Sequence, residues 1–307
     1  VHMREGIAQA KLARGDPVAA VKQYDAILDT ARIRAYRAKI LYLAGQALVK
    51  ANDPKAAYDR YAQAVDRYPE AYESYLALVE LVNAGVAVDD YQRGLVDYYA
   101  GAYQPAIEAF TRVIEANPKN HTGDVHWYLA LSLKASGNLS PAIQQFQELI
   151  KEHPQNEHAV EAWLEMAEAY AWRDATDQAI QTYRDLADRF PQSPLAVTAL
   201  WRAAELELAG GDLATAAASF RALAARYPTA DDAPEALFKA ALLDYRRTDF
   251  EAVCDGSQAL VRNYPDSRAG IAARFWLGKA WLALGKADEA KAAFEATQEW
   301  SPVSYYG

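Results

Sequence analysis

The sequence predicts an all-α chain built from tandem helical hairpins, and two observations carry this prediction. First, hydrophobic residues make up 52% of the 307 residues, Ala is abundant and β-branched runs are scarce, a composition that favours helices. Second, proline recurs at a fixed interval of 37 residues, which indicates a repeated structural unit. The prolines of this series are Pro154, Pro191, Pro228, Pro265 and Pro302.

Two further columns of residues share the 37-residue interval and predict how each hairpin packs. One keeps a small residue in the first helix of each unit, and the other keeps a mostly aromatic residue in the second helix. A small residue lets two helices approach closely, and a ring fills the remaining gap. The small column holds Ala130, Ala167, Ala204, Ala241 and Gly278; the aromatic column holds Phe146, Tyr183, Phe220, Ser257 and Phe294.

Turn signals separate the two helices of each unit. Gly accepts the left-handed backbone conformation that ends a first helix, and Asp or Asn can cap the second helix. The proline of each unit then ends the second helix, because its ring disfavours helical geometry in the preceding residue. In chain order the turns are Gly15-Asp16-Pro17, Asn52-Asp53-Pro54, Ser136-Gly137-Asn138, Gly210-Gly211-Asp212 and Gly285-Lys286.

One interval between prolines is longer than the others. Pro69 and Pro118 are 49 residues apart, which is one repeat plus a short helix, and the amphipathic residues 71–83 supply that helix. We therefore expect about eight helix pairs plus one extra helix in a continuous α-solenoid. Its predicted parts are N-terminal repeats at 1–69, an irregular segment with the extra helix and one repeat at 70–119, and five 37-residue repeats at 120–307.

Charge and rare residues exclude several classes of function. The net charge is -9 without a cluster of Lys and Arg, which argues against nucleic acid as a partner. The single cysteine, Cys254, cannot form an internal disulfide, and its helix predicts a buried structural side chain. The five histidines show no metal-ligand spacing, so we expect neither a structural metal nor a cofactor. No apolar run reaches the length of about 18 residues that a transmembrane helix needs.

The repeated pattern resembles the tetratricopeptide repeat over almost the whole chain. The shared features are a small residue, an aromatic four residues later, a small or aliphatic residue three beyond, and a terminal proline. The interval of 37 residues exceeds the family's usual repeat of about 34. The resemblance implies a right-handed superhelix whose inner groove, lined mainly by first helices, binds a protein or peptide partner.

A narrower resemblance is to the N-terminal superhelical domain of bacterial soluble lytic transglycosylases. It implies a location outside the cytoplasm, a link to peptidoglycan, and a catalytic domain that follows Gly307, since residues 301–307 read as the start of a further element. The alternative is a free-standing periplasmic adaptor of the outer-membrane assembly or cell-division type. The matching segments are residues 88–110 and 274–307, with Trp276, Gly278, Lys279, Tyr305, Tyr306 and Gly307 at family positions.

Catalysis by this chain itself is not expected. A lytic transglycosylase needs a Glu-Ser pair followed by a Gly-Leu-Met-Gln segment, and only Glu73-Ser74 supplies the pair, within an ordinary amphipathic pattern. The acidic pairs Asp89-Asp90 and Asp231-Asp232 precede predicted helices, where capping is the favoured role.

Candidate groove residues come from one more column in the first helices. If its rings face the groove they form a ladder for a partner, whereas packing within the array is the favoured interpretation for aromatics at helical spacing. The charged residues one turn beyond could select the charge of a ligand. The column is Trp127, Leu164, Trp201, Phe238 and Phe275, and the charges are Glu168, Glu205 and Lys279. Packing is also favoured for Tyr98, Tyr99 and Tyr103.

Overall fold

The computed structural model describes residues 2–300, with side chains for residues 3–298. Every regular element in this range is an α-helix, which confirms the predicted fold class. Within the same range, no helix combines the length and the apolar character needed to cross a membrane. The predicted signature residues Tyr305, Tyr306 and Gly307 lie outside the described residues.

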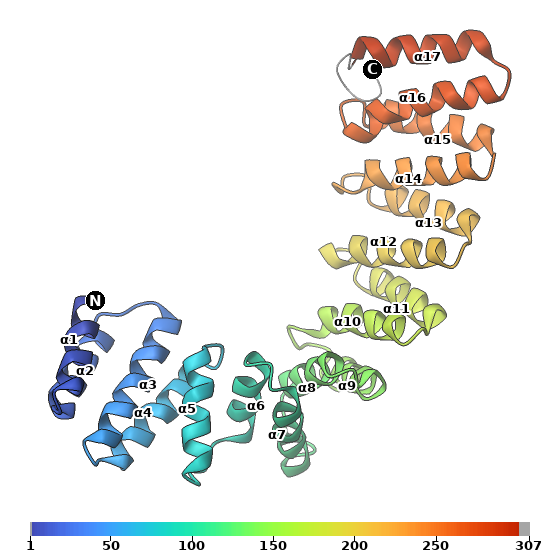
Figure 1. Cartoon of the computed structure of the whole chain (residues 1–307). Coiled ribbons are helices and arrows are strands. Elements are labelled where there is room, and N and C mark those ends of the chain that lie inside the picture. Colours follow the sequence, from blue (N-terminus) through green and yellow to red (C-terminus); the bar gives the residue numbers. More distant parts are fainter. Residues whose placement is uncertain (1, 301–307) are drawn as a thin grey trace. The chain divides into compact units, whose positions relative to one another are not determined.

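The chain divides into two compact units, residues 1–159 and residues 160–307. Unit 1 holds four helical hairpins and one additional helix, shown in blue to green in Figure 1. The additional helix, α5, covers Tyr72–Asn83 and confirms the element expected at residues 71–83. The hairpins are α1 (His2–Ala13) with α2 (Pro17–Leu28), α3 (Arg34–Lys50) with α4 (Pro54–Arg67), α6 (Asp90–Tyr99) with α7 (Tyr103–Ala116), and α8 (Gly123–Ala135) with α9 (Leu139–Glu152).

Unit 2 holds four further hairpins, so that residues 2–300 contain the eight pairs and one extra helix that were expected. The predicted boundaries at residues 69 and 119 follow the regularity of the repeat and stay a prediction. The hairpins of unit 2 are α10 (Ala159–Trp172) with α11 (Thr176–Arg189), α12 (Pro194–Ala209) with α13 (Leu213–Arg226), α14 (Ala233–Arg246) with α15 (Phe250–Asn263), and α16 (Arg268–Ala283) with α17 (Ala287–Trp300).

The predicted match of a small residue with a ring is present in several hairpins. In α3 a Cβ added to Gly45 would lie 2.2 Å from the ring of Tyr61, so only glycine fits against this tyrosine. The same relation holds at Gly278, where an added Cβ would lie 2.7 Å from the ring of Phe294. Phe220 is fully buried beside Ala204, which belongs to the same core cluster. These hairpins therefore close around one large side chain, whereas the α14–α15 hairpin carries the small Ser257 at the corresponding position, as the aromatic column showed.

Stacking of hairpins produces the array within each unit. Helices pack mainly on their predecessor and successor, and additional contacts join α3 with α5 and α14 with α16. First helices of neighbouring hairpins are in direct contact at α6 with α8 and at α14 with α16. The result is an α-solenoid in which each repeat buries an apolar face that it could not bury alone.

The turns follow the predicted chemistry with one exception. Gly211 has a φ of 87°, a left-handed conformation that favours glycine, and Gly15, Gly137 and Gly285 also have positive φ, whereas Gly210 has a φ of -70° and ends α12 in helical geometry. Asp16, Asp53 and Asp212 each accept a hydrogen bond from a backbone N–H in the first turn of the following helix. Asn138 precedes α9 without such a bond, and its side-chain amide N–H donates to Ser136 Oγ.

Candidate functional site

Two adjoining depressions open beside the first helices of unit 2. The larger, of about 600 Å³, is lined by residues of α10, α11 and α12. The smaller, of about 320 Å³, is lined by residues of α12 and by Asp232, which precedes α14. Arg202 and Glu205 of α12 line both depressions. The two depressions therefore form one continuous surface, here called the groove. The groove residues used below are Glu168, Trp172, Tyr183, Trp201, Arg202, Glu205 and Asp232.

Acidic side chains outnumber basic ones among the residues that line the groove. The carboxylates of Glu168, Glu205 and Asp232 contribute three negative charges, and Arg202 contributes one positive charge. Glu205 lies 3.7 Å from Arg202 and 3.3 Å from Lys239 of α14, so it is held in place while 36% of its side chain stays exposed. With the positive charges of Arg202 and Lys239 beside Glu205, the surface keeps a small acidic excess, and Glu205 is positioned by α12 and α14.

Two aromatic residues of the larger depression differ in exposure. The Trp172 side chain, in the last turn of α10, is 61% exposed. Tyr183, from α11, is almost fully buried, and burial, followed by the negative charge of Glu168, raises the pKa of its hydroxyl. The hydroxyl therefore stays protonated near neutral pH and keeps its hydrogen-bond donor. Apolar contact area and polar atoms thus occur together in this depression.

The predicted aromatic column lies on the first helices but packs largely inward. Trp201 contacts Phe220 of its own hairpin with ring centroids 5.1 Å apart, and Phe275 contacts Phe294 at 5.7 Å. Trp127 and Phe238 are each only 9% exposed. Leu164 is partly buried against the core of α10 to α12. Packing, the interpretation favoured from the sequence, accounts for these contacts, and only Trp201 also lines the groove.

The predicted charges have different surroundings. Glu168 and Glu205 both line the larger depression, so the structure brings these two together. Lys279 of α16 lies over the ring of Trp276 at 4.4 Å and over that of Tyr245 at 5.1 Å, away from the two depressions. Its ammonium group is thus held by aromatic faces, an attraction typically worth about 0.5–2 kcal/mol.

Other residues considered from the sequence have structural partners. Ser74 is buried in α5 and donates a hydrogen bond of 2.9 Å to the carbonyl oxygen of Ala64. Cys254 is buried, as predicted, and burial raises the pKa of its thiol. Asp89 caps α6 by accepting from the backbone N–H of Gln92, whereas Asp232 makes no capping bond to α14, so the predicted cap is correct only at Asp89. Tyr98 packs its ring against Tyr99 at 5.3 Å, as expected.

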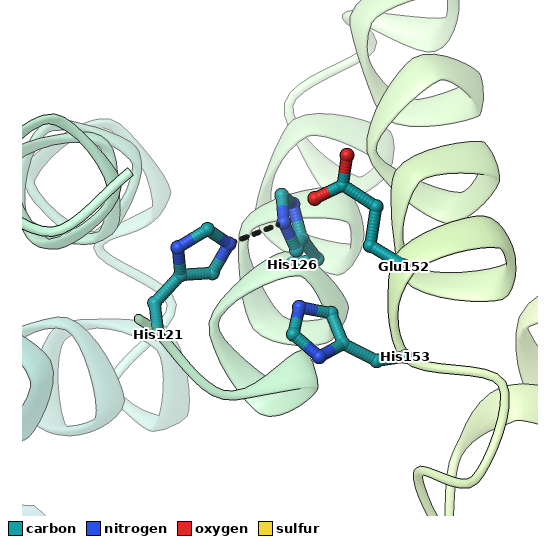
Figure 2. Close-up of side chains that lie close together, drawn as sticks. All are labelled: His121, His126, Glu152 and His153. Carbon is teal, nitrogen blue, oxygen red and sulfur yellow. Dashed lines mark hydrogen bonds between the residues drawn. The ribbon is translucent and has the colours of Figure 1, made fainter. Parts of the chain in front are cut away.

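A second site, in unit 1, was not anticipated from residue spacing. It gathers His121 from the loop before α8, His126 from the first turns of α8, and Glu152 and His153 from the end of α9. Their potential ligand atoms all lie within 4.8 Å of one another. Figure 2 shows the three imidazole rings converging and the Glu152 side chain turned toward His126. These four residues are called the histidine cluster.

Local packing explains why the cluster forms. A Cβ added to Gly123, the first residue of α8, would lie 2.9 Å from the Cβ of His153 and 2.8 Å from Asn156 Nδ2. Glycine therefore lets the start of α8 touch the loop that follows α9. Burial, more than any other factor, lowers the pKa of His126, and the neighbouring histidines act in the same direction. His126 is thus neutral near pH 7 in the absence of a bound cation.

Comparison with known proteins identifies the repeat. Two family models, each described as a tetratricopeptide repeat, match the chain: one at residues 42–90, 91–157, 128–194 and 173–231, the other at 235–267 and 272–299. No curated protein has a matching sequence. The matched repeats occupy most of the chain between residues 42 and 299.

Three similar solved structures illustrate the range of matches. The crystal structure of MamA protein is 17% identical, with a TM-score of 0.40 over 59% of this chain and 92% of that chain. The structure of Naa15/Naa10 bound to HypK-THB is 14% identical, with a TM-score of 0.48 over 99% of this chain and 42% of that chain. The crystal structure of YrrB, described as a TPR protein with an unusual peptide-binding site, is 14% identical, with a TM-score of 0.39 over 66% of this chain and 96% of that chain.

Proposed function

The chain belongs to the tetratricopeptide repeat family, and from this premise we propose that it is a non-catalytic scaffold whose groove in unit 2 binds a segment of a partner protein. Repeats of this kind form stiff arrays with extended surfaces suited to protein–protein interaction. The observation that carries the proposal is the continuous groove along α12, in which Trp172, Tyr183 and three carboxylates line adjoining depressions.

The chemistry of the groove favours a peptide that combines a basic side chain with an apolar one. A Lys or Arg of the ligand would meet Glu168 and Glu205, which line the larger depression together. An apolar or aromatic side chain would cover the exposed ring of Trp172. Because the acidic side chains are partly exposed, their attraction for a basic ligand weakens as salt rises.

A display selection with random peptides on the full 307-residue chain tests this proposal. We expect enriched peptides to carry Lys or Arg, and the double variant Glu168→Gln/Glu205→Gln to bind them at least about tenfold more weakly, the effect of losing about 1.4 kcal/mol. Glu251→Gln is the matched control, because Glu251 is an exposed residue of the second helix α15. Equal binding by the groove variant and the control would refute the assignment of the groove.

For the biological setting, we propose that the chain is the N-terminal scaffold of a peptidoglycan lytic transglycosylase located outside the cytoplasm. The support is the similarity of residues 88–110 and 274–307 to that family. In the structure, Gly278 of the matching helix makes room for Phe294, and Lys279 lies over Trp276. On this proposal the array sets where an attached active site reaches, and groove contacts add affinity.

The parent gene distinguishes this setting from the alternative of a free-standing envelope adaptor. A Glu-Ser pair followed by Gly-Leu-Met-Gln in the residues encoded after Gly307 supports the transglycosylase. A stop codon directly after Gly307, or an unrelated domain there, refutes it and favours the adaptor. The purified 307-residue chain should release no glycan fragments from peptidoglycan, and turnover that Glu73→Gln abolishes would overturn the non-catalytic assignment.

A further inference from the structure

The histidine cluster holds four of the chain's potential metal ligands in one place, although the repeat pattern does not require any of them there. The position of His153, before the proline that ends a repeat, is filled by Phe190, Tyr227 and Tyr264 in the following repeats. The position of His126 is filled by Trp163, Leu200 and Leu237 in those repeats. One repeat therefore replaces an apolar pair with two imidazoles, and four of the five histidines in the chain lie between residues 121 and 158.

Hydrogen bonds determine which ring nitrogens face the centre of the cluster. His121 Nδ1 lies 2.8 Å from the carbonyl oxygen of Asn117, which can only accept, so this nitrogen carries a proton. His126 Nδ1 lies 2.7 Å from Gln145 Oε1 and donates to it in the same way. In the neutral tautomer that carries its proton on Nδ1, the Nε2 atom of each ring has the lone pair. Metal-binding histidines use this arrangement, with the outer N–H held by a carbonyl oxygen.

The two lone pairs meet. His121 Nε2 and His126 Nε2 are only 2.8 Å apart, as the dashed line in Figure 2 marks, and with both Nδ1 atoms donating, a proton or a metal ion between the two nitrogens satisfies this contact. A proton would serve these two rings alone. It would leave His153 Nε2, which is buried and has no hydrogen-bond partner among the described residues. A metal ion can bind all three nitrogens and also the carboxylate of Glu152, which offsets part of its charge.

The structure thus assigns a binding site for one divalent transition-metal cation of the Zn²⁺ class to His121, His126, His153 and Glu152. Three imidazoles with one carboxylate suit Zn²⁺ in tetrahedral geometry, and imidazole ligands disfavour Mg²⁺ and Ca²⁺. Zn–N bonds of 2.0–2.1 Å place tetrahedral ligand atoms about 3.3 Å apart. His121 Nε2 and His126 Nε2 are 2.8 Å apart and all the potential ligand atoms lie within 4.8 Å of one another, so the cluster has the size that this geometry needs.

Bound metal would tie two loops of unit 1 together. His121 lies in the loop between α7 and α8, His126 near the start of α8, and His153 follows the last residue of α9. A cation that joins them closes the α8–α9 hairpin at the end where its chain enters and leaves. The role is structural, and it is independent of the groove in unit 2.

A nearby group of potential ligands, Asp124, Glu157 and His158, is a weaker candidate and serves as a control. Asp124 Oδ1 already accepts a hydrogen bond of 2.7 Å from Asn156, and the ring of His158 stacks on Trp127 with centroids 4.7 Å apart. His158→Gln removes an imidazole from the same region without touching the cluster.

The test is a Zn²⁺ titration of the full chain after treatment with a chelator, read by calorimetry and by thermal unfolding. We expect one Zn²⁺ per chain, a higher melting temperature with Zn²⁺ and no effect of Mg²⁺. The double variant His126→Leu/His153→Tyr restores residue types of the neighbouring repeats, so it should fold without metal. We expect it to bind Zn²⁺ more than about 100-fold more weakly, while His158→Gln binds as the wild type does.

Three outcomes would overturn the assignment. They are the absence of stoichiometric Zn²⁺ binding by the wild-type chain, undiminished binding by the folded double variant, and a loss of binding in His158→Gln as large as in the double variant. A Co²⁺-substituted sample adds a spectroscopic readout, because tetrahedral coordination gives strong visible absorption that the double variant should lack.

Discussion

Phe220→Ala removes the ring around which the α12–α13 hairpin closes. This ring is fully buried, lies edge-on to Trp201 with centroids 5.1 Å apart, and has Lys239 Nζ 5.4 Å from its centroid. Truncating a buried Phe to Ala typically costs 3–5 kcal/mol through lost transfer energy and the cavity left behind. Of this, about 0.5–1.5 kcal/mol reflects the lost contact between the two rings.

Because a solenoid repeat contacts mainly its neighbours, the loss should be concentrated locally. A local loss of 3 kcal/mol speeds amide hydrogen exchange by about 100-fold where exchange needs that region to open. We therefore expect the largest acceleration in α12 to α14, with a smaller one in α17. Peptide-resolved hydrogen exchange measures this profile, and urea unfolding measures the total loss.

Leu282→Ala is the matched control, because its side chain is 59% exposed and its truncation should change stability by less than about 0.5 kcal/mol. If Phe220→Ala destabilised unit 2 no more than this control, the reasoning about the ring would be refuted. If exchange in α17 rose as much as in α12 to α14, the picture of neighbour-to-neighbour stabilisation would be refuted.

Four further substitutions test individual contacts. Burial raises the pKa of the Asp97 carboxyl from 3.8 to about 6. Between pH 3.8 and 6 the folded state therefore keeps a proton on Asp97 that the unfolded state has released. The free energy of unfolding falls as pH rises through this window. Asp97→Asn should remove that fall and raise the free energy of unfolding at pH 7 by roughly 2 kcal/mol in urea titrations, and a less stable variant would contradict this. Ser257→Ala should stabilise by about 1 kcal/mol, since the Ser257 hydroxyl is buried without a partner among the described residues; a lower melting temperature would count against it. Gly94→Ala should destabilise the protein by about 1 kcal/mol, because the added Cβ would lie 2.6 Å from the ring of Phe110. Gly256→Ala should stabilise it by up to about 1 kcal/mol through helix propensity, because the nearest atom to the added Cβ, in Ala241, is 4.0 Å away. Changes of the same sign in the free energy of unfolding of the two variants would refute this distinction.

The fold was predictable because the same local pattern of small, aromatic, turn and proline residues recurs in many repeats. Prolines at a 37-residue interval separated the hairpins, and residues 71–83 filled the single long gap as α5. The match of small residues with rings foretold contacts such as that between Gly278 and Phe294. These features depend on residues near in sequence or on one repeated interval, so no distant contact had to be guessed.

The groove was predictable in part. The first helices were the expected surface, and Glu168 and Glu205 lie together there. Sequence periodicity places a side chain on a helix face but does not decide how far a ring turns toward its own hairpin. Trp201 turns onto Phe220 and still lines the groove, whereas Phe238 is buried.

The histidine cluster was missed because its ligands have no motif spacing. His126 and His153 are 27 residues apart and meet only because a hairpin returns the chain to its starting end. Gly123 permits the close approach of the two loops, and this cannot be read from spacing. A signal was present in the aligned repeats, since His153 stands where Phe190 and Tyr227 stand in later ones.

The most direct test of the scaffold assignment is a hydrogen-exchange footprint of the full chain with a selected peptide. The groove predicts protection concentrated in the first helices α10 and α12, around Trp172 and Arg202. The second helices α13 and α15 should change little. Protection confined to second helices, or a bound peptide that leaves α10 and α12 unprotected, would contradict the account.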